Sequence, residues 1–188
     1  MKAKPWEILK KEKLLKTRIF DIEKRRCRSR VQEKEADFFV LDSDTWVNIA
    51  AVTEDENIIL IRQYRAGTDE VALEIPGGIC ERGEDPADAG LRELKEETGF
   101  TAQSSRVLGY VRPNPAFMNN RCYTVLATGC RKTADTDFDD DEEIETIEFP
   151  LIQFPELIKK GEIDHSLVWS AYVHMLHAGV IKLPDSAD

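Results

Sequence analysis

The chain has 188 residues, of which 41% are hydrophobic and 33% charged, proportions typical of one soluble globular domain. Its formal net charge of −10 argues against a protein that binds nucleic acid through a basic surface. No apolar run reaches the roughly 18 residues that a membrane-spanning helix needs, and the N-terminus lacks the apolar core of a secretory signal. Four cysteines without a Cys-x-x-Cys pair indicate reduced thiols, so we expect a cytoplasmic protein.

Charge is distributed unevenly along the chain. Thirteen of the 26 basic residues lie in the first 34 positions, whereas eight of the eleven residues from Asp135 to Glu145 are acidic. This basic arm and this acidic loop can approach each other within or between subunits, or each can remain a separate solvated segment. We expect an N-terminal arm over residues 1–50 and one main domain over residues 51–188.

The first half of the chain is predicted to be rich in β-strands. Alternation around Ile19 and Ile22 predicts a short strand that runs into a hairpin. Three runs of β-branched and aromatic residues follow at 36–42, 46–55 and 57–67, with acidic turns between them. Residues 71–78, which read VALEIPGG, predict a further strand that leads into a Gly-Gly turn.

The second half is predicted to mix strands and helices. Strands are expected at 104–112, 121–130 and 143–152, and amphipathic helices within 154–163 and 165–179. A sheet with one internal helix and helices at its end is an α+β layered domain.

The internal helix is expected over about residues 86–98 and carries the most specific pattern in the chain. Asp85 suits the N-cap, Pro86 suits the first helical position, and Gly99 supplies the C-terminal stop. At 100° per residue, three acidic residues fall along one side of the helix and apolar residues lie opposite. The acidic set is Glu93, Glu96 and Glu97, and the apolar set is Ala87, Leu91 and Leu94.

Acidic residues three and four positions apart repel each other, so a cation should compensate them. Arg92 can reach Glu96 one turn further along the helix. This leaves Glu93 and Glu97 to bind a hard divalent cation through oxygen, as Mg²⁺ prefers.

At these residues the chain resembles the Nudix hydrolase family, whose motif has the form Gly-x5-Glu-x7-Arg-Glu-apolar-x-Glu-Glu-x-Gly-apolar. The positions that match are Gly78, Glu84, Arg92, Glu93, Leu94, Glu96, Glu97, Gly99 and Phe100. The resemblance implies an α/β/α sandwich of a mixed sheet with the motif helix, in addition to the β-rich N-terminal arm. It also implies metal-dependent hydrolysis of nucleoside diphosphates linked to another group.

The resemblance assigns roles within the motif. Glu93 and Glu97 are the expected principal metal ligands, Glu96 is a further ligand or positions the metal, and the Gly77 carbonyl completes the set. The metal is Mg²⁺, with Mn²⁺ as the open alternative. Gly78, Glu84, Arg92 and Gly99 are expected to support this arrangement.

The general base is expected on a loop downstream of the motif. In the family's nucleotide-sugar branch, a glutamate in such a loop contacts the attacking water. Glu142 fits best and Glu143 is the alternative, although Thr146 stands where that branch usually has an apolar residue.

Residues outside the motif resemble those of ADP-ribose and other nucleoside diphosphate sugar pyrophosphatases. Arg65 would hold a phosphate, Glu74 would act at the terminal sugar or the metal, and Pro115 matches a proline of that branch. Phe117, or an N-terminal aromatic such as Trp46, would stack on the base. The expected substrate is a nucleoside diphosphate sugar, such as ADP-ribose or GDP-mannose, cut to a nucleoside monophosphate and a sugar phosphate.

Two other functions remain open: a housecleaning pyrophosphatase of nucleoside triphosphates, and a Nudix-fold sensor that binds its ligand without cleaving it. The nucleotide-sugar branch often forms dimers that exchange N-terminal strands, so a homodimer exchanging residues 1–50 is a further hypothesis. We interpret His165 as structural and His174 with His177 as a surface pair.

Overall fold

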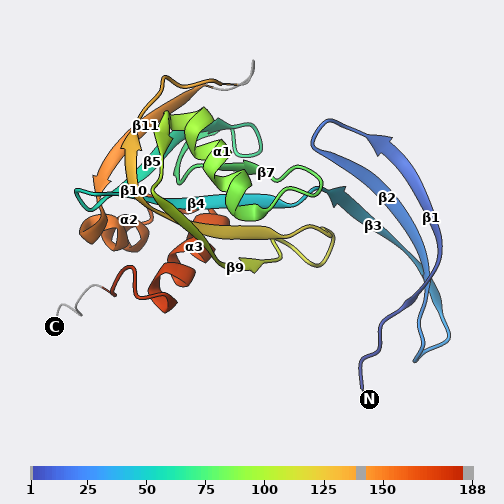
Figure 1. The fold of residues 1–188 in the computed structure, drawn as a ribbon. Helices are drawn as coiled ribbons and strands as arrows, with labels where there is room; N and C mark the ends of the chain where they lie inside the picture. The colour runs from blue at the N-terminus through green and yellow to red at the C-terminus, as the bar shows by residue number, and fades with distance from the viewer. Residues whose placement is uncertain (1, 139–142, 184–188) are drawn as a thin grey trace. The chain divides into compact units, whose positions relative to one another are not determined.

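The computed structural model describes residues 2–138 and 143–183. The chain divides into two compact units (Figure 1). The first unit combines Met1–Asp44 with Arg112–Arg121, and the second combines Thr45–Val111 with Cys122–Asp188.

The first unit is built on an antiparallel sheet of three long strands, in the order β1-β2-β3. These are β1 (Glu7–Lys16), β2 (Phe20–Arg28) and β3 (Glu35–Ser43). The sequence predicted β2 and β3 but not β1, whose ten residues are all exposed and have no alternation of buried and polar positions. Pairing with β2 gives β1 its strand conformation.

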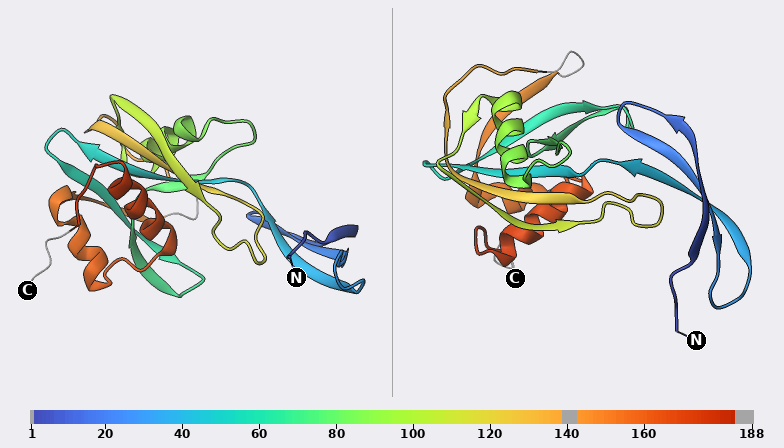
Figure 2. Two further views of the ribbon diagram at one scale, coloured as in Figure 1. Left: turned by 90° about the horizontal axis from the view of Figure 1, so that it is seen from below. Right: turned by 45° about the vertical axis from the view of Figure 1, so that its right-hand side comes forward.

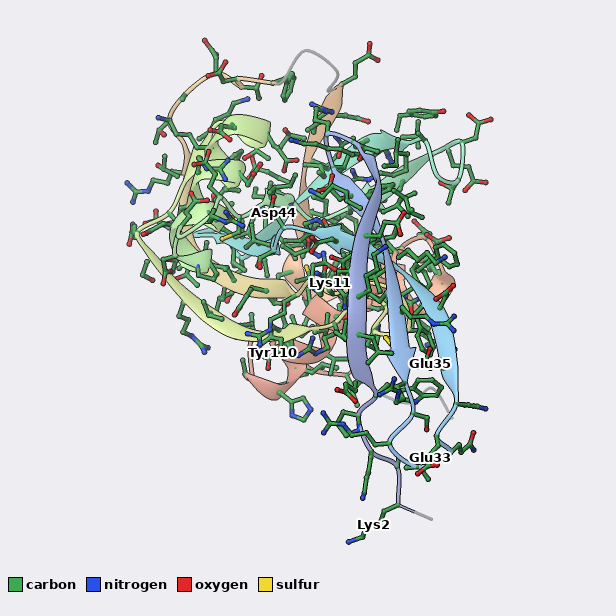
Figure 3. All side chains as sticks on the ribbon, turned by 90° about the vertical axis from the view of Figure 1, so that its right-hand side faces the viewer. Lys2, Lys11, Glu33, Glu35, Asp44 and Tyr110 are labelled. Atoms are coloured by element: carbon green, nitrogen blue, oxygen red, sulfur yellow. The ribbon has the colours of Figure 1, made fainter. Side chains whose placement is uncertain are left out.

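Charged side chains line the strands of this sheet, among them Lys11 on β1 and Glu35 on β3, which are labelled in Figure 3, and several of them form ion pairs between neighbouring strands. Arg28 lies opposite Glu35 and contacts it at 2.9 Å, and Arg26 lies opposite Asp37 and contacts it at 3.2 Å. The returning segment, residues 112–121, is held on β3, because the Leu41 amide donates to the Phe117 carbonyl at 2.8 Å.

The second unit contains an eight-stranded mixed sheet with the main order β11-β5-β4-β10-β8. β4 and β10 are parallel, and the other pairs are antiparallel. β6 pairs with β5, β7 with β4 and β9 with β10. The strands are β4 (Trp46–Thr53), β5 (Asn57–Arg65), β6 (Glu70–Glu74), β7 (Gly77–Ile79), β8 (Phe100–Thr101), β9 (Ser104–Val111), β10 (Cys122–Lys132) and β11 (Ile144–Pro150).

Helices cover both faces of this sheet (Figure 2). α1 (Pro86–Thr98) packs on one face, while α2 (Phe154–Lys160) and α3 (Ser166–His177) pack on the other, after a short 3-10 turn at Leu151–Gln153. Alternation along β5 serves both cores, because Ile59 packs with the α1 residues whereas Ile58 and Leu60 pack with the α2 and α3 residues. The predicted α+β layered fold with a strand-rich N-terminus is confirmed. Within the described residues, no helix is long and apolar enough to cross a membrane.

Candidate active site

Helix α1 begins and ends where the sequence predicts. The Asp85 side chain accepts a hydrogen bond from the Ala87 amide at 2.8 Å. At the other end, Gly99 adopts a φ of 75° and its amide donates to the Lys95 carbonyl at 2.8 Å. Leu94 is fully buried, and Ala87 and Leu91 pack against the same core. The caps and the apolar face therefore fix α1 on the sheet.

The predicted Gly-Gly turn is wrong: Gly77 and Gly78 belong to strand β7, which pairs with β4. The reason is close packing on both sides of the strand. A Cβ on Gly77 would lie 2.3 Å from the Val47 carbonyl oxygen, and a Cβ on Gly78 would lie 2.4 Å from the Glu93 carboxyl carbon. Glycine at these positions lets the backbone of β7 approach both β4 and the acidic side of α1.

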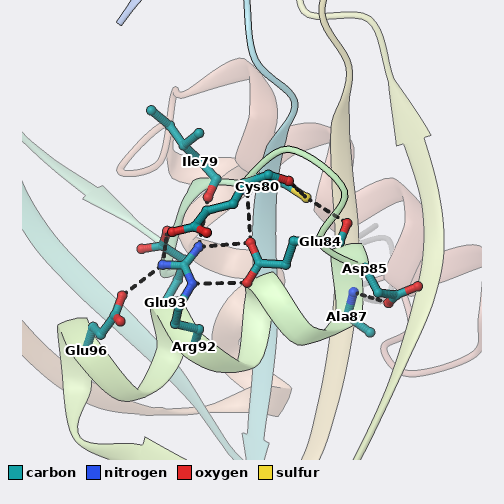
Figure 4. Close-up of polar contacts among 9 residues, drawn as sticks. Ile79, Cys80, Glu84, Asp85, Ala87, Arg92, Glu93 and Glu96 are labelled. Atoms are coloured by element: carbon teal, nitrogen blue, oxygen red, sulfur yellow. Dashed lines mark hydrogen bonds and ion pairs between the residues drawn. The ribbon is translucent and has the colours of Figure 1, made fainter. Parts of the chain in front are cut away.

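Arg92 connects three of the acidic residues of the motif, Glu84, Glu93 and Glu96 (Figure 4). Its Nε and Nη2 donate to the two Glu84 carboxylate oxygens at 3.1 and 3.2 Å. Its Nη1 donates to Glu93 and Glu96, each at 2.9 Å, and Nη2 also reaches the Ile79 carbonyl. The predicted contact with Glu96 is confirmed. Arg92 also contacts Glu93, which is predicted to be a metal ligand. The hydrogen bond from Arg92 lowers the pKa of the Glu84 carboxyl, and that same bond raises the pKa of Arg92.

Glu97 is buried, which its place on the acidic side of the helix did not predict. Its exposure is only 2%, and its Oε2 accepts a hydrogen bond from the Gly77 amide at 3.0 Å. The cause is β7, which lies against α1 and covers this carboxylate. This hydrogen bond connects Glu97 to the glycine whose carbonyl is predicted to bind the metal.

The donor groups here suit a hard divalent cation, since they are carboxylate and carbonyl oxygens. The absence of a Cβ on Gly78 also allows the backbone to reach the Glu93 carboxylate. Among residues 2–138 and 143–183, however, no three His, Cys, Asp or Glu side chains are arranged to hold a metal ion. Arg92 contacts both Glu93 and Glu96, and Glu97 is directed to Gly77.

Arg65 and Glu74 form a second polar cluster on strands β5 and β6. Nε and Nη2 of Arg65 donate to the two Glu74 oxygens at 2.8 and 2.9 Å, which is a bidentate pair. Burial alone would raise the pKa of Glu74, but hydrogen bonds from His165 and Arg65 outweigh it and lower that pKa to about 2. Glu74 lies three residues before Gly77, so their Cα atoms are at most about 11 Å apart.

The interpretation of His165 as structural named no partner for its side chain, and the structure provides one, because His165 Nδ1 lies 2.9 Å from Glu74 Oε2. The two residues are 91 positions apart, so no local motif could have predicted the contact. His174 is also more than a surface residue, because its Nδ1 lies 2.9 Å from the buried Thr124 hydroxyl.

The remaining predicted residues lie outside these two clusters. Pro115 and Phe117 belong to the first unit, where the Phe117 side chain is 44% exposed. Trp46 begins β4 and is partly buried. Glu142 lies outside the described residues, and its alternative, Glu143, is exposed just before β11. Their roles stay predictions.

Comparison with known proteins now identifies the family. The model of the NUDIX domain matches residues 44–169, which is most of the chain. The chain belongs to the Nudix family. The matched range contains the whole of α1, both motif glycines, Arg65 and Glu74.

Two bacterial relatives are similar to part of the chain. A methanol dehydrogenase activator from Bacillus methanolicus is 33% identical over 118 residues, which are 62% of this chain and 64% of that protein. An ADP-ribose pyrophosphatase from Bacillus subtilis is 32% identical over 118 residues, which are also 62% of this chain and 64% of that protein. The chain therefore matches less than two thirds of the length of these relatives.

The fold also agrees with a solved Nudix structure. A crystal structure of an ADP compounds hydrolase superposes with a TM-score of 0.81 at 22% identity. The superposition covers 95% of this chain and 98% of the other. At this identity the likeness concerns the fold.

Proposed function

We propose that this Nudix protein hydrolyses the diphosphate bond of a nucleoside diphosphate sugar, with ADP-ribose or GDP-mannose as representative substrates. The products are a nucleoside monophosphate and a sugar phosphate. The observation that carries the proposal is the chain of contacts around β7. Buried Glu97 accepts a hydrogen bond from the Gly77 amide, and Glu74, three residues before Gly77, forms a bidentate pair with Arg65.

In this proposal, Glu93, Glu96, Glu97 and the Gly77 carbonyl come together only when Mg²⁺ or Mn²⁺ binds, because in this structure Glu93 and Glu96 contact Arg92 and Glu97 contacts the Gly77 amide. Such a cation, when bound, neutralises charge on the oxygens of a diphosphate. Arg92 keeps the helix-borne carboxylates Glu93 and Glu96 in place, because its one guanidinium contacts both of them and also Glu84, which lies before the helix.

Other residues act on the substrate and the water. Arg65 binds a phosphate through its planar guanidinium, which Glu74 orients. Glu142, or Glu143 in its place, accepts the proton of the attacking water. Pro115 and Phe117 contribute to the substrate pocket, with Phe117 or Trp46 stacked on the base.

The relatives support the nucleotide-sugar class. Besides the Bacillus subtilis protein, an ADP-ribose pyrophosphatase from Saccharomyces cerevisiae is 32% identical over 118 residues, which are 60% of this chain and 51% of that protein. Arg65 and Glu74 match the residues that this class shares outside the motif, and they are in contact here. This favours nucleotide sugars over nucleoside triphosphates.

We propose further that the chain forms a homodimer through its N-terminal arm, residues 1–50, and that residues 51–188 form the catalytic domain. All ten side chains of β1 are exposed within one chain, as are Phe38 and Phe39 on β3. An uncovered strand edge with apolar side chains favours association with a second copy. A cytoplasmic location agrees with four cysteines that are all free thiols.

A substrate panel tests the proposed activity. Purified protein is incubated with ADP-ribose, GDP-mannose, dinucleoside polyphosphates, coenzyme A and nucleoside triphosphates, with Mg²⁺, Mn²⁺ or EDTA, and products are separated by chromatography. We expect metal-dependent release of a nucleoside monophosphate from nucleotide sugars. Turnover confined to triphosphates would support a housecleaning enzyme, and binding without turnover of any compound would support a sensor.

A further inference from the structure

The residue that precedes α3 uses its side chain in an unusual way for its position. His165 is the N-cap of α3, with extended backbone angles of φ −63° and ψ 118°. N-cap side chains normally accept a hydrogen bond from the first amides of the helix, and His165 makes no such bond. Its imidazole lies against Glu74 instead, with Nδ1 at 2.9 Å from Oε2.

The backbone of His165 is held firmly, so its imidazole has a defined position. Its carbonyl accepts hydrogen bonds from the Val168 and Trp169 amides at 3.0 and 3.1 Å. The Trp169 indole then donates to the carbonyl of the fully buried Ile163 at 3.0 Å. These contacts anchor the turn before α3 on both sides of His165.

Glu74 needs more than one partner because it is almost fully buried. Its side chain is 4% exposed, and a buried carboxylate is costly unless its oxygens are hydrogen-bonded. Arg65 occupies one edge of the carboxylate through both oxygens, and His165 adds a further contact on Oε2. With partners on two sides, the carboxylate is fixed in one orientation.

The orientation of Glu74 determines that of Arg65. The Arg65 side chain is 40% exposed, and its bidentate contact with Glu74 restricts the rotamers that it can adopt. Arg65 and Glu74 are not opposite each other in the strand pairing, since Arg65 pairs with Glu70 and Glu74 pairs with Ile61. Their contact therefore depends on where the Glu74 carboxylate points, which is the property that His165 fixes.

We propose that His165 is a positioning residue, which holds Glu74 so that the Arg65 guanidinium is preorganised to bind the substrate's diphosphate. His165 does not touch the substrate. This inference rests on the proposed function, because it assumes that Arg65 binds a phosphate. It assigns to the start of α3 a contribution to substrate affinity that lies outside the motif helix.

Two substitutions separate the effect of the hydrogen-bond donor of His165 from the effect of its side-chain volume. In His165→Asn the amide nitrogen takes the place of Nδ1 and keeps a donor toward Glu74, whereas His165→Leu keeps the volume and removes the donor. We expect His165→Leu to raise KM for ADP-ribose roughly tenfold with kcat within about twofold, which is the pattern of lost binding without lost chemistry. His165→Asn should restore KM to within roughly threefold of the wild type. A role in folding alone would lower the melting temperature and leave KM unchanged.

A second readout follows Arg65 directly and needs no turnover. The Nε–H resonance of Arg65 is identified by its loss in Arg65→Lys, and its exchange with solvent is measured by NMR. We expect faster exchange in His165→Leu than in the wild type and His165→Asn, because the bidentate contact loosens. Unchanged exchange in His165→Leu would overturn the proposal, as would an unchanged KM for His165→Leu while Arg65→Lys raises KM.

The same variants distinguish failure of this proposal from failure of the proposed function. If the wild type hydrolyses no nucleotide sugar, the proposed function fails on the substrate panel, whatever the NMR exchange shows. If the wild type is active but Arg65→Lys leaves KM unchanged, Arg65 is not a phosphate ligand and the positioning role of His165 falls with it.

Discussion

The Glu74 carboxylate combines near-complete burial with a bidentate arginine partner, and this links protein stability to pH. Its folded-state pKa is about 2, below the ordinary value of 4.5. Because the folded pKa is the lower one, the contribution is fully present above pH 4.5 and is lost as pH falls toward 2. At neutral pH it amounts to about 3 kcal/mol, from 1.36 kcal/mol for each pKa unit.

Urea unfolding at a series of pH values tests this linkage. Between pH 4.5 and pH 2, we expect the unfolding free energy of Glu74→Gln to fall less steeply than that of the wild type. Glu148→Gln, which neutralises an exposed glutamate on β11, is the matched control and should follow the wild type. Equal slopes for the wild type and Glu74→Gln would show that the burial of Glu74 is not linked to protonation.

Individual side chains were predictable only where their partners are close in the sequence. The Arg92–Glu96 contact spans one helical turn, so spacing alone predicted it. The burial of Glu97 was missed because it depends on the docking of β7, twenty residues earlier. The contact between His165 and Glu74 was missed because it joins α3 to β6 through the tertiary fold.

Close packing constrains the sequence of strand β7. A Cβ on Gly77 would lie 2.3 Å from a backbone oxygen of Val47, which cannot move without displacing β4. We therefore expect Gly77→Ala to destabilise the protein by about 1–3 kcal/mol or more, as overpacked sites do. Gly67→Ala is the control, since nothing lies within 4 Å of its Cβ, and it should change stability by less than about 0.5 kcal/mol.

The predicted difference in stability is tested by measuring the denaturant midpoints of Gly77→Ala and Gly67→Ala. A midpoint for Gly77→Ala that equals that of Gly67→Ala would mean that β7 can move away from β4 at little cost. The account of why glycine occupies this strand would then be wrong.

The elements themselves followed from the sequence to different degrees. Buried strands β4 and β5 and helix α1 carry clear periodicity and were predicted close to their observed bounds. β1 was missed because its side chains are all exposed, so its strand character comes from pairing with β2 rather than from a buried face. Gly77 and Gly78 were predicted to form a turn but lie in strand β7, because packing against β4 and α1 outweighs the local turn propensity of two glycines.

For the whole molecule, the proposed homodimer can be tested by light scattering of the full chain. We expect twice the mass of one chain in the wild type. Phe39→Asp, at a side chain that is 58% exposed on β3, should shift the population toward the monomer. Ile152→Asp, at an 84% exposed position in the second unit, is the matched control and should remain dimeric. A wild type of single-chain mass would contradict the proposal.

The central claim is that the acidic residues of α1 support metal-dependent hydrolysis, and Glu97 tests it most directly. The measurement is kcat for ADP-ribose at saturating Mg²⁺ in the wild type, Glu97→Gln and Glu81→Gln, the last at an exposed glutamate outside the cluster. The account predicts a loss on the order of 100-fold or more for Glu97→Gln, and a value within about twofold of the wild type for Glu81→Gln. A folded Glu97→Gln variant that hydrolyses ADP-ribose at the wild-type rate would contradict it.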